Sequence, residues 1–141
     1  MGKRNKLRII LDCNWYVSGS INRKSRRTIY TVINNPKLTV IYSDELLEEY
    51  NTVITRPKFQ GIISKYQANR FIQFLLPRLH KVKITSAVNT SRDAKDNYLL
   101  ALAKASKAEF LVTGDEDLLV IRKFNTTRII KLTEFLKMIA E

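Results

Sequence analysis

Several residue types that would define a functional site are scarce in this sequence. Its 141 residues include one cysteine and one histidine, which excludes an internal disulfide and leaves too few ligands for a cysteine-based zinc site. No apolar run reaches the roughly 18 residues of a membrane-spanning helix, and no hydrophobic signal segment is evident. We therefore expect a cytoplasmic protein that does not bind membranes. With 4 glycines and 3 prolines, linkers are not expected, and residues 1–141 are predicted to form a single domain with its core at about 7–135.

Positive charge is present in excess. Lysine and arginine number 25 against 13 aspartate and glutamate residues, a formal net charge of +12. Such a surface attracts polyanions, nucleic acid first, although an anionic membrane, an acidic protein partner or simple solubility are alternatives. Basic residues gather at 22–27 and 56–58, where they could contact RNA phosphates or be ordinary solvated side chains. The candidates for nucleic-acid binding are Arg23, Lys24, Arg26, Arg27, Arg56 and Lys58.

Short apolar runs alternate with segments of helical periodicity. Strands are predicted at 7–11, 37–42, 81–85, 109–113 and 128–132. Helices are predicted at 26–35, 44–56, 64–79, 95–107, 115–121 and 133–141, with a loop before the first of them. Ser43 and Thr133 are the expected N-caps of the second and last helices. This alternation predicts an α/β fold of Rossmann-like, three-layer type, with a mostly parallel sheet of about five strands and helices on both faces.

Carboxylates follow two of the predicted strands. Asp12 ends the first strand, and Asp115 comes shortly after the fourth. The carboxyl ends of parallel strands lie at one edge of the sheet, where such folds place their binding crevice. On the helix at 44–56, Glu49 falls at the edge of the apolar stripe while Glu48 falls nearly opposite it. Glu49 is therefore better placed than Glu48 to reach inward, and Asp96 begins another, mostly buried helix.

These four acids, Asp12, Glu49, Asp96 and Asp115, predict an acidic metal centre. Crowded carboxylates repel one another unless a cation neutralises them. Oxygen ligands without nearby histidine or cysteine suit Mg²⁺ or Mn²⁺, and such ions activate water and stabilise the transition state of phosphodiester cleavage. Each acid alone also has a structural interpretation: Asp12 or Asp115 as a helix cap or turn residue, Asp96 as a partner of a helix dipole, and Glu49 as a solvated helix residue. Asp93 and Asp117 lie close in sequence to Asp96 and Asp115 and could have accessory roles in this metal centre.

Three stretches resemble motifs of the PIN domain family, specifically of toxins in toxin–antitoxin modules. Asp12-Cys13-Asn14 resembles the opening D-T-N, with cysteine in place of the usual threonine. Residues 45–59 resemble the second motif, in which the acid stands four residues before the valine of V-[IL]-x-R-P-K; this selects Glu49. Residues 92–119 resemble R-D-x-K-D-N followed by T-G-D-x-D-L-L, which places family metal-site acids on Asp96 and Asp115, with Asp117 as a further candidate.

The resemblance implies an endoribonuclease that depends on Mg²⁺ or Mn²⁺ and leaves 5′-phosphate and 3′-hydroxyl ends. It implies that Asp12, Asp96 and Asp115 bind metal, that Glu49 binds metal or positions water, and that Asn14 and Thr113 orient the ligands. It also implies an antitoxin protein as partner and a possible homodimer.

Two other functions compete with the ribonuclease. A phosphatase of the haloacid dehalogenase type also places an aspartate after its first strand. It needs a second aspartate two positions later, where this sequence has Asn14. A non-catalytic domain that binds RNA or a protein partner would explain the basic surface, but it has no use for the full set of acids.

Overall fold

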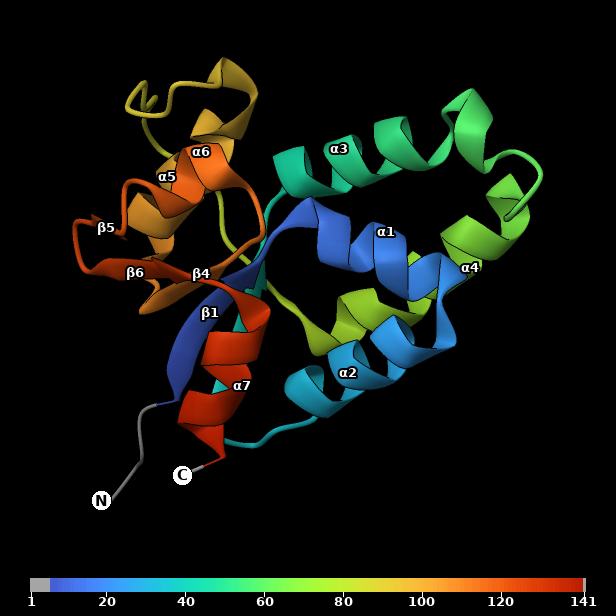
Figure 1. The fold of residues 1–141 in the computed structure, drawn as a ribbon, viewed down its shortest axis with the longest axis horizontal. Coiled ribbons are helices and arrows are strands. Elements are labelled where there is room, and N and C mark those ends of the chain that lie inside the picture. Colours follow the sequence, from blue (N-terminus) through green and yellow to red (C-terminus); the bar gives the residue numbers. More distant parts are fainter. Residues whose placement is uncertain (1–5, 141) are drawn as a thin grey trace.

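The computed structural model describes residues 6–140 and contains, within that range, one sheet of six strands (Figure 1). The strands are β1 (Leu7–Leu11), β2 (Leu38–Tyr42), β3 (His80–Lys81), β4 (Phe110–Val112), β5 (Lys123–Phe124) and β6 (Thr127–Ile130). The α-helices are α1 (Cys13–Ile21), α2 (Arg23–Ile33), α3 (Asp44–Ile54), α4 (Lys65–Leu75), α5 (Asn97–Ser106), α6 (Glu116–Leu119) and α7 (Leu132–Ile139). Three short 3₁₀ turns are η1 (Pro57–Phe59), η2 (Leu76–Arg78) and η3 (Ala94–Asp96). Residues 1–5 and 141, which belong to the predicted domain, lie outside the described residues.

The sheet confirms the predicted α/β fold. Its strand order is β3-β2-β1-β4-β6-β5, and every neighbouring pair is parallel except β5 with β6. Leu11 of β1 lies opposite Val112 of β4, so the residues that follow, Asp12 and Thr113, leave the sheet beside each other. At this point the chain has placed β2 on one side of β1 and β4 on the other. It is the switch point at which open α/β sheets form their binding crevice.

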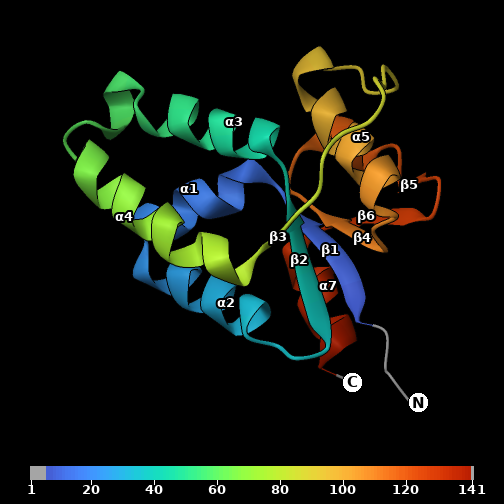
Figure 2. The same cartoon turned by 180° about the vertical axis from the view of Figure 1, so that it is seen from behind.

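Helices cover both faces of the sheet. In Figures 1 and 2, α1 to α4 gather on one side of the strands, and α5 and α6 lie on the other. The central strand is enclosed over its last three residues, since Ile9, Ile10 and Leu11 are at most 1% exposed. Helix α7 packs Phe135 against Phe110 of β4, with ring centroids 5.6 Å apart. None of the helices within residues 6–140 combines the length and the apolar character needed to cross a bilayer.

The predicted loop after the first strand is wrong, because residues 13–21 form α1. The Asp12 side chain caps this helix by accepting a hydrogen bond from the Asn14 backbone. The buried side of the helix includes Gly19 and Ser20, so the segment lacks the continuous apolar stripe that is typical of a surface helix. Gly19 allows α1 to approach α2 closely: a Cβ there would lie 2.5 Å from Ile29 Cδ1 and 3.0 Å from Phe71 Cζ.

The structure differs from the prediction at two short strands and at the start of the last helix. The third strand is two residues long instead of five, because β3 pairs only with the last two residues of β2. The two-residue strand β5 was not predicted, since it depends on left-handed backbone at Arg122 and Asn125 (φ of 66° and 53°). The last helix begins at Leu132 after Lys131, so Thr133 is not its N-cap.

Candidate metal centre

Asp12 lies at the carboxyl end of the central strand and is only 6% exposed. One carboxylate oxygen accepts the Asn14 backbone N–H at 3.3 Å, and the other accepts the Thr113 hydroxyl at 2.5 Å. Burial raises the pKa of Asp12 above its usual value, although both hydrogen bonds act in the opposite direction. Asp12 is therefore a helix cap, as one interpretation predicted, and also a buried acid at the switch point. The Asn14 side chain is exposed, so its observed contribution is the backbone N–H.

Thr113 connects two of the predicted acids. Its hydroxyl is fully buried, donates to Asp12 and accepts the backbone N–H of Asp115 at 3.0 Å. Asp115 in turn caps α6 by accepting the Asp117 backbone N–H at 2.9 Å. The hydroxyl thus fixes the distance between the ends of β1 and β4, from which Asp12 and Asp115 project.

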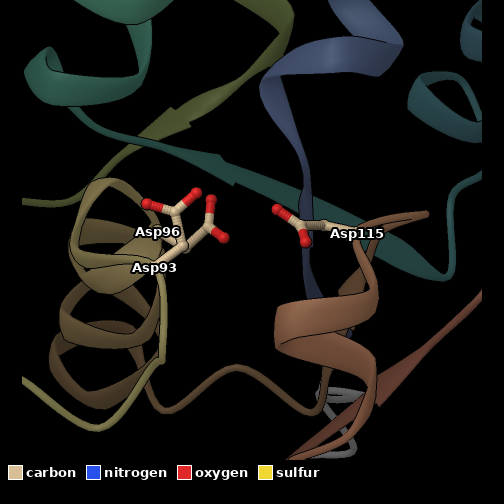
Figure 3. Close-up of side chains that lie close together, drawn as sticks. All are labelled: Asp93, Asp96 and Asp115. Atoms are coloured by element: carbon tan, nitrogen blue, oxygen red, sulfur yellow. The ribbon is translucent and has the colours of Figure 1, made fainter.

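Three carboxylates converge beside this pair of strands. Asp93, Asp96 and Asp115 each have an oxygen within 4.8 Å of the others. Figure 3 shows Asp93 and Asp96 next to each other at the start of α5, with Asp115 pointing toward them from the start of α6. The turn η3 holds the first two, because Asp93 accepts the Lys95 backbone N–H at 3.1 Å. We call Asp93, Asp96 and Asp115 the carboxylate triad.

Asp96 is the most perturbed member of the triad. Its Oδ2 atom is shielded from solvent and has no hydrogen-bond partner among the described residues. Burial, together with the close approach and charge of Asp115, raises the pKa of Asp96 from 3.8 to about 8. Two carboxylates this close must share a proton or a cation. Oxygen donors only, one of them buried without a partner, fit a hard divalent ion such as Mg²⁺ or Mn²⁺.

Glu49 faces the site from α3, whereas Glu48 on the same helix is exposed. The Tyr98 hydroxyl donates a hydrogen bond to Glu49 Oε1. Burial raises the pKa of Glu49, and the charge of Asp12 adds to this, while the Tyr98 hydrogen bond and the charge of Arg56 lower it. Glu49 is therefore close enough to Asp12 and Arg56 to interact electrostatically with both, although it is not part of the carboxylate triad.

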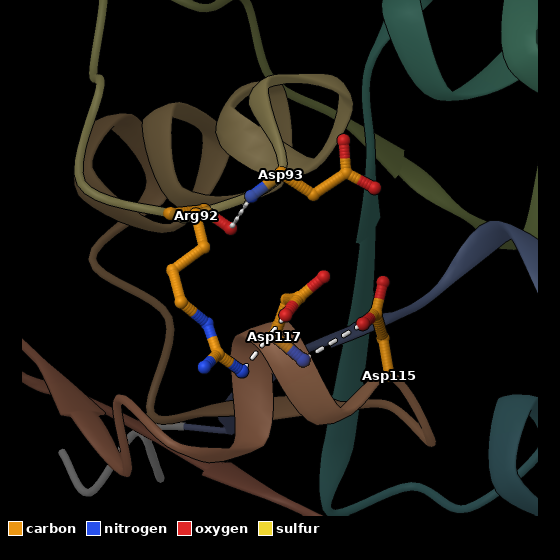
Figure 4. A network of polar contacts seen from close by, with 5 residues as sticks. Arg92, Asp93, Asp115 and Asp117 are labelled. Carbon is orange, nitrogen blue, oxygen red and sulfur yellow. Dashed lines mark hydrogen bonds and ion pairs between the residues drawn. The ribbon is translucent and has the colours of Figure 1, made fainter.

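Asp117 faces a different partner. Its Oδ1 atom lies 2.8 Å from the Arg92 guanidinium (Figure 4). Asp117 does not belong to the carboxylate triad, and its observed contacts are this ion pair and the backbone bond to Asp115. The ion pair joins the loop before η3 to α6, so it holds together the two segments that carry the triad.

The predicted basic residues fall into two places. Arg23, Lys24, Arg26 and Arg27 belong to α2, which begins where α1 ends, roughly 13 Å along α1 from Asp12. The Arg26 guanidinium donates to the carbonyls of Gly19 and Ser20 at 2.8 and 3.1 Å, so it caps α1. Arg23, Lys24 and Arg27 are exposed. Arg56 is close enough to lower the pKa of Glu49, while the Lys58 ammonium lies 5.1 Å from the Phe59 ring.

Sequence reasoning did not select Tyr98, Arg92 or Asn97 as members of the site. Arg92 and Asn97 belong to the R-D-x-K-D-N motif, and Tyr98 directly follows it. Asn97 accepts the Ser91 backbone N–H at 2.8 Å and so closes the loop that carries Asp93. The sequence places these residues within or beside the motif. It does not indicate their contacts, because partners such as Tyr98 and Glu49 are 49 residues apart along the chain.

The structure is thus an α/β domain with carboxylates crowded at the switch point of its sheet. The family model described as "PIN domain" matches residues 8–117. The chain belongs to the PIN domain family.

Solved structures agree with this assignment at the level of the fold. The chain is similar to PAE2754 from Pyrobaculum aerophilum, with a TM-score of 0.61 and 15% identity, covering 96% of this chain and 91% of that one. It is similar to VapBC2 from Rickettsia felis bound to a promoter DNA fragment, with a TM-score of 0.57, 15% identity and coverage of 87% and 97%. For FitAcB from Neisseria gonorrhoeae the TM-score is 0.53, the identity 14% and the coverage 87% and 96%.

One curated protein also matches part of the sequence. Receptor-type tyrosine-protein phosphatase zeta of Rattus norvegicus is 28% identical over 90 residues, which is 64% of this chain. Those residues are only 4% of that protein's length. A likeness of this extent does not bear on activity.

Proposed function

We propose that this protein is a divalent-metal-dependent endoribonuclease and the toxin of a toxin–antitoxin module. The observation that carries the proposal is the carboxylate triad, in which Asp96 has a buried and unpartnered oxygen beside Asp115. A protein without metal chemistry gains nothing from this arrangement, since unrelieved repulsion between carboxylates lowers stability. Membership of the PIN domain family supports the same conclusion.

Asp96 and Asp115 would hold the ion, with Asp12 and Asp93 beside them. Bound Mg²⁺ or Mn²⁺ supplies positive charge to the scissile phosphodiester and lowers the pKa of water. We retain the sequence-based hypothesis that Asp117 is a further ligand, although its ion pair with Arg92 favours a positioning role.

The chain's own side chains would orient water and move its proton. Tyr98 occupies one oxygen of Glu49, which leaves Oε2 to accept a proton from the attacking water. A water oxygen bonds to phosphorus while the bond from phosphorus to the 3′ oxygen breaks, and the departing 3′ oxygen takes a proton from solvent, which yields 5′-phosphate and 3′-hydroxyl ends. Thr113 keeps Asp12 and Asp115 in place throughout. Asn14 contributes through its backbone N–H to Asp12.

The proposed partners follow from charge and from the related structures. A net charge of +12 favours RNA as the substrate. The motif resemblance to toxins, together with fold neighbours such as VapBC2 and FitAcB, supports a cognate antitoxin protein, a possible homodimer and a cytoplasmic location.

The test is cleavage of a mixed RNA pool by the purified protein with Mn²⁺ and with EDTA. The proposal predicts cutting only with Mn²⁺, ends carrying 5′-phosphate, and loss of cutting in Asp96→Asn and Glu49→Gln. Glu48→Gln is the matched control, because Glu48 is exposed on the same helix, and it should cut normally. Equal cutting by the Asp96→Asn protein would contradict the proposal. Tight RNA binding that EDTA does not alter, without any cutting, would favour the non-catalytic binding domain.

A further inference from the structure

A basic groove lies next to the candidate metal centre, and sequence reasoning did not identify it. The groove has a volume of about 740 Å³ and is formed by α6, the β5–β6 hairpin and the start of α7. Figure 1 shows the hairpin at the edge of the sheet below α6. Its cations are all exposed and are Arg122, Lys123, Arg128 and Lys131. Glu116, the residue after Asp115 of the triad, lines the same groove, so the groove begins on the other side of the start of α6.

Two of these cations lie directly opposite each other. Lys123 of β5 pairs with Arg128 of β6 in the antiparallel register, which puts both side chains on the same face of the hairpin. Like charges in this position destabilise a strand pair, and this pair has only two residues on each strand. The charges therefore favour an anion above the hairpin.

Among the described residues, the groove cations have no partners of opposite charge at ion-pair distance. Within residues 6–140 the ion pairs are Lys81 with Asp44 and Arg92 with Asp117. Glu116 and Glu134 line the groove without pairing with its arginines or lysines. The four cations are thus available to an external polyanion, in contrast to Arg26, which caps α1.

We propose that this groove binds the phosphate backbone of a single-stranded RNA and leads it to the carboxylate triad. The choice of RNA depends on the proposed ribonuclease activity. The start of α6 separates the two sites: Asp115 faces the triad and Glu116 faces the groove. The strand crosses this helix start, with one phosphate at the acids and the following phosphates over Lys123 and Arg128. Such contacts give affinity without sequence preference.

The experiment measures binding of a labelled single-stranded RNA in EDTA, where cutting is absent, at several salt concentrations. The groove variant is Lys123→Gln with Arg128→Gln. Each lost phosphate contact reduces the salt slope by about 0.7 for single strands, so the slope should fall by about 1.4, which corresponds to roughly 25-fold weaker binding at ~0.1 M salt. The charge-matched control is Lys37→Gln with Lys65→Gln, two exposed lysines outside the groove, and it should keep a slope close to that of the wild type.

The outcomes separate this proposal from the ribonuclease proposal. One outcome is a groove variant that still cuts RNA with Mn²⁺ and whose RNA affinity and salt slope match those of the control. This outcome contradicts the groove proposal and leaves the ribonuclease proposal standing. In that case the cations only protect an edge strand from pairing with other chains. Groove-dependent RNA binding by a protein that never cuts RNA supports the groove and contradicts the nuclease. Polyglutamate that displaces RNA as effectively as unlabelled RNA at equal charge would identify an acidic protein as the occupant and overturn the RNA assignment.

Discussion

Among single residues, Asp96 experiences most of the repulsion within the carboxylate triad. Its buried Oδ2 has no hydrogen-bond partner within residues 6–140, and Asp115 lies beside it. At pH ~9, where Asp96 is ionised, we expect Asp96→Asn to stabilise the metal-free protein, because an amide removes a charge and supplies a donor to Asp115. The gain should be about 1 kcal/mol, or ~3 °C in Tm, since water screens part of the repulsion at this partly exposed side chain. Thermal unfolding in EDTA measures it, and a lower Tm than that of the wild type would contradict the prediction.

The same residue should make the stability of the metal-free protein depend on pH. Burial and Asp115 raise the pKa of Asp96 from 3.8 to about 8 in the folded state. The folded protein therefore keeps a proton that the unfolded chain releases between these values, and this contribution to stability is lost as the pH rises through that range. Urea unfolding in EDTA near pH ~5 and pH ~9 should show wild type losing stability relative to Asp96→Asn. Parallel pH curves for the two proteins would show that Asp96 titrates normally.

Thr113 should control the metal site without being a ligand. Thr113→Val removes the donor to Asp12 and the acceptor for the Asp115 backbone N–H. We expect a stability loss of about 1–3 kcal/mol and Mn²⁺ affinity lower by about 10- to 100-fold. Titration calorimetry measures the affinity, and Thr113→Ser, which keeps the hydroxyl, should bind Mn²⁺ nearly as tightly as wild type. Unchanged Mn²⁺ affinity in Thr113→Val would show that the hydroxyl does not position the acids.

At the scale of whole elements, the packing of α1 against α2 depends on Gly19. A Cβ at this position would lie 2.5 Å from Ile29 Cδ1, so Gly19→Ala should destabilise the protein by about 1–3 kcal/mol through overpacking. Ile29→Val removes that Cδ1 atom and should recover part of the loss in the double variant. Gly61→Ala is the control, because a Cβ there meets nothing within 4 Å. Chemical unfolding compares the wild type, the three single variants and the double variant, and an equal effect of the two alanine substitutions would contradict the packing argument.

The elements also show which parts of the fold can be predicted from sequence. The strands β1, β2, β4 and β6 were predicted within one or two residues, because buried parallel strands are short β-branched runs between helical segments. Helix α1 was missed because its buried side includes Gly19 and Ser20 and so forms no apolar stripe. The short strands β3 and β5 are determined by pairing partners and by local backbone conformation, which a periodicity pattern does not contain.

Across the whole molecule, the same limit applies to the site. Asp12 and Asp115 could be predicted to approach each other, because both follow parallel strands that turn out to be neighbours. The ion pair of Arg92 with Asp117 and the bond of Tyr98 to Glu49 join segments that are distant in sequence. Likewise, the four cations of the basic groove all lie within residues 122–131, but the β5–β6 hairpin determines that they line one groove with α6 and α7. The residue types therefore indicated an acidic metal site, whereas the contacts between its residues depend on the tertiary fold.

The central claim is that the carboxylate triad binds a divalent cation. The most direct measurement is anomalous scattering from a crystal of the protein soaked in Mn²⁺. The account predicts a manganese peak bonded to carboxylate oxygens of Asp96 and Asp115, and loss of that peak in Asp96→Asn. The absence of a peak at saturating Mn²⁺, with Asp96 and Asp115 within hydrogen-bonding distance of each other, would show that the two acids share a proton instead and would contradict the account.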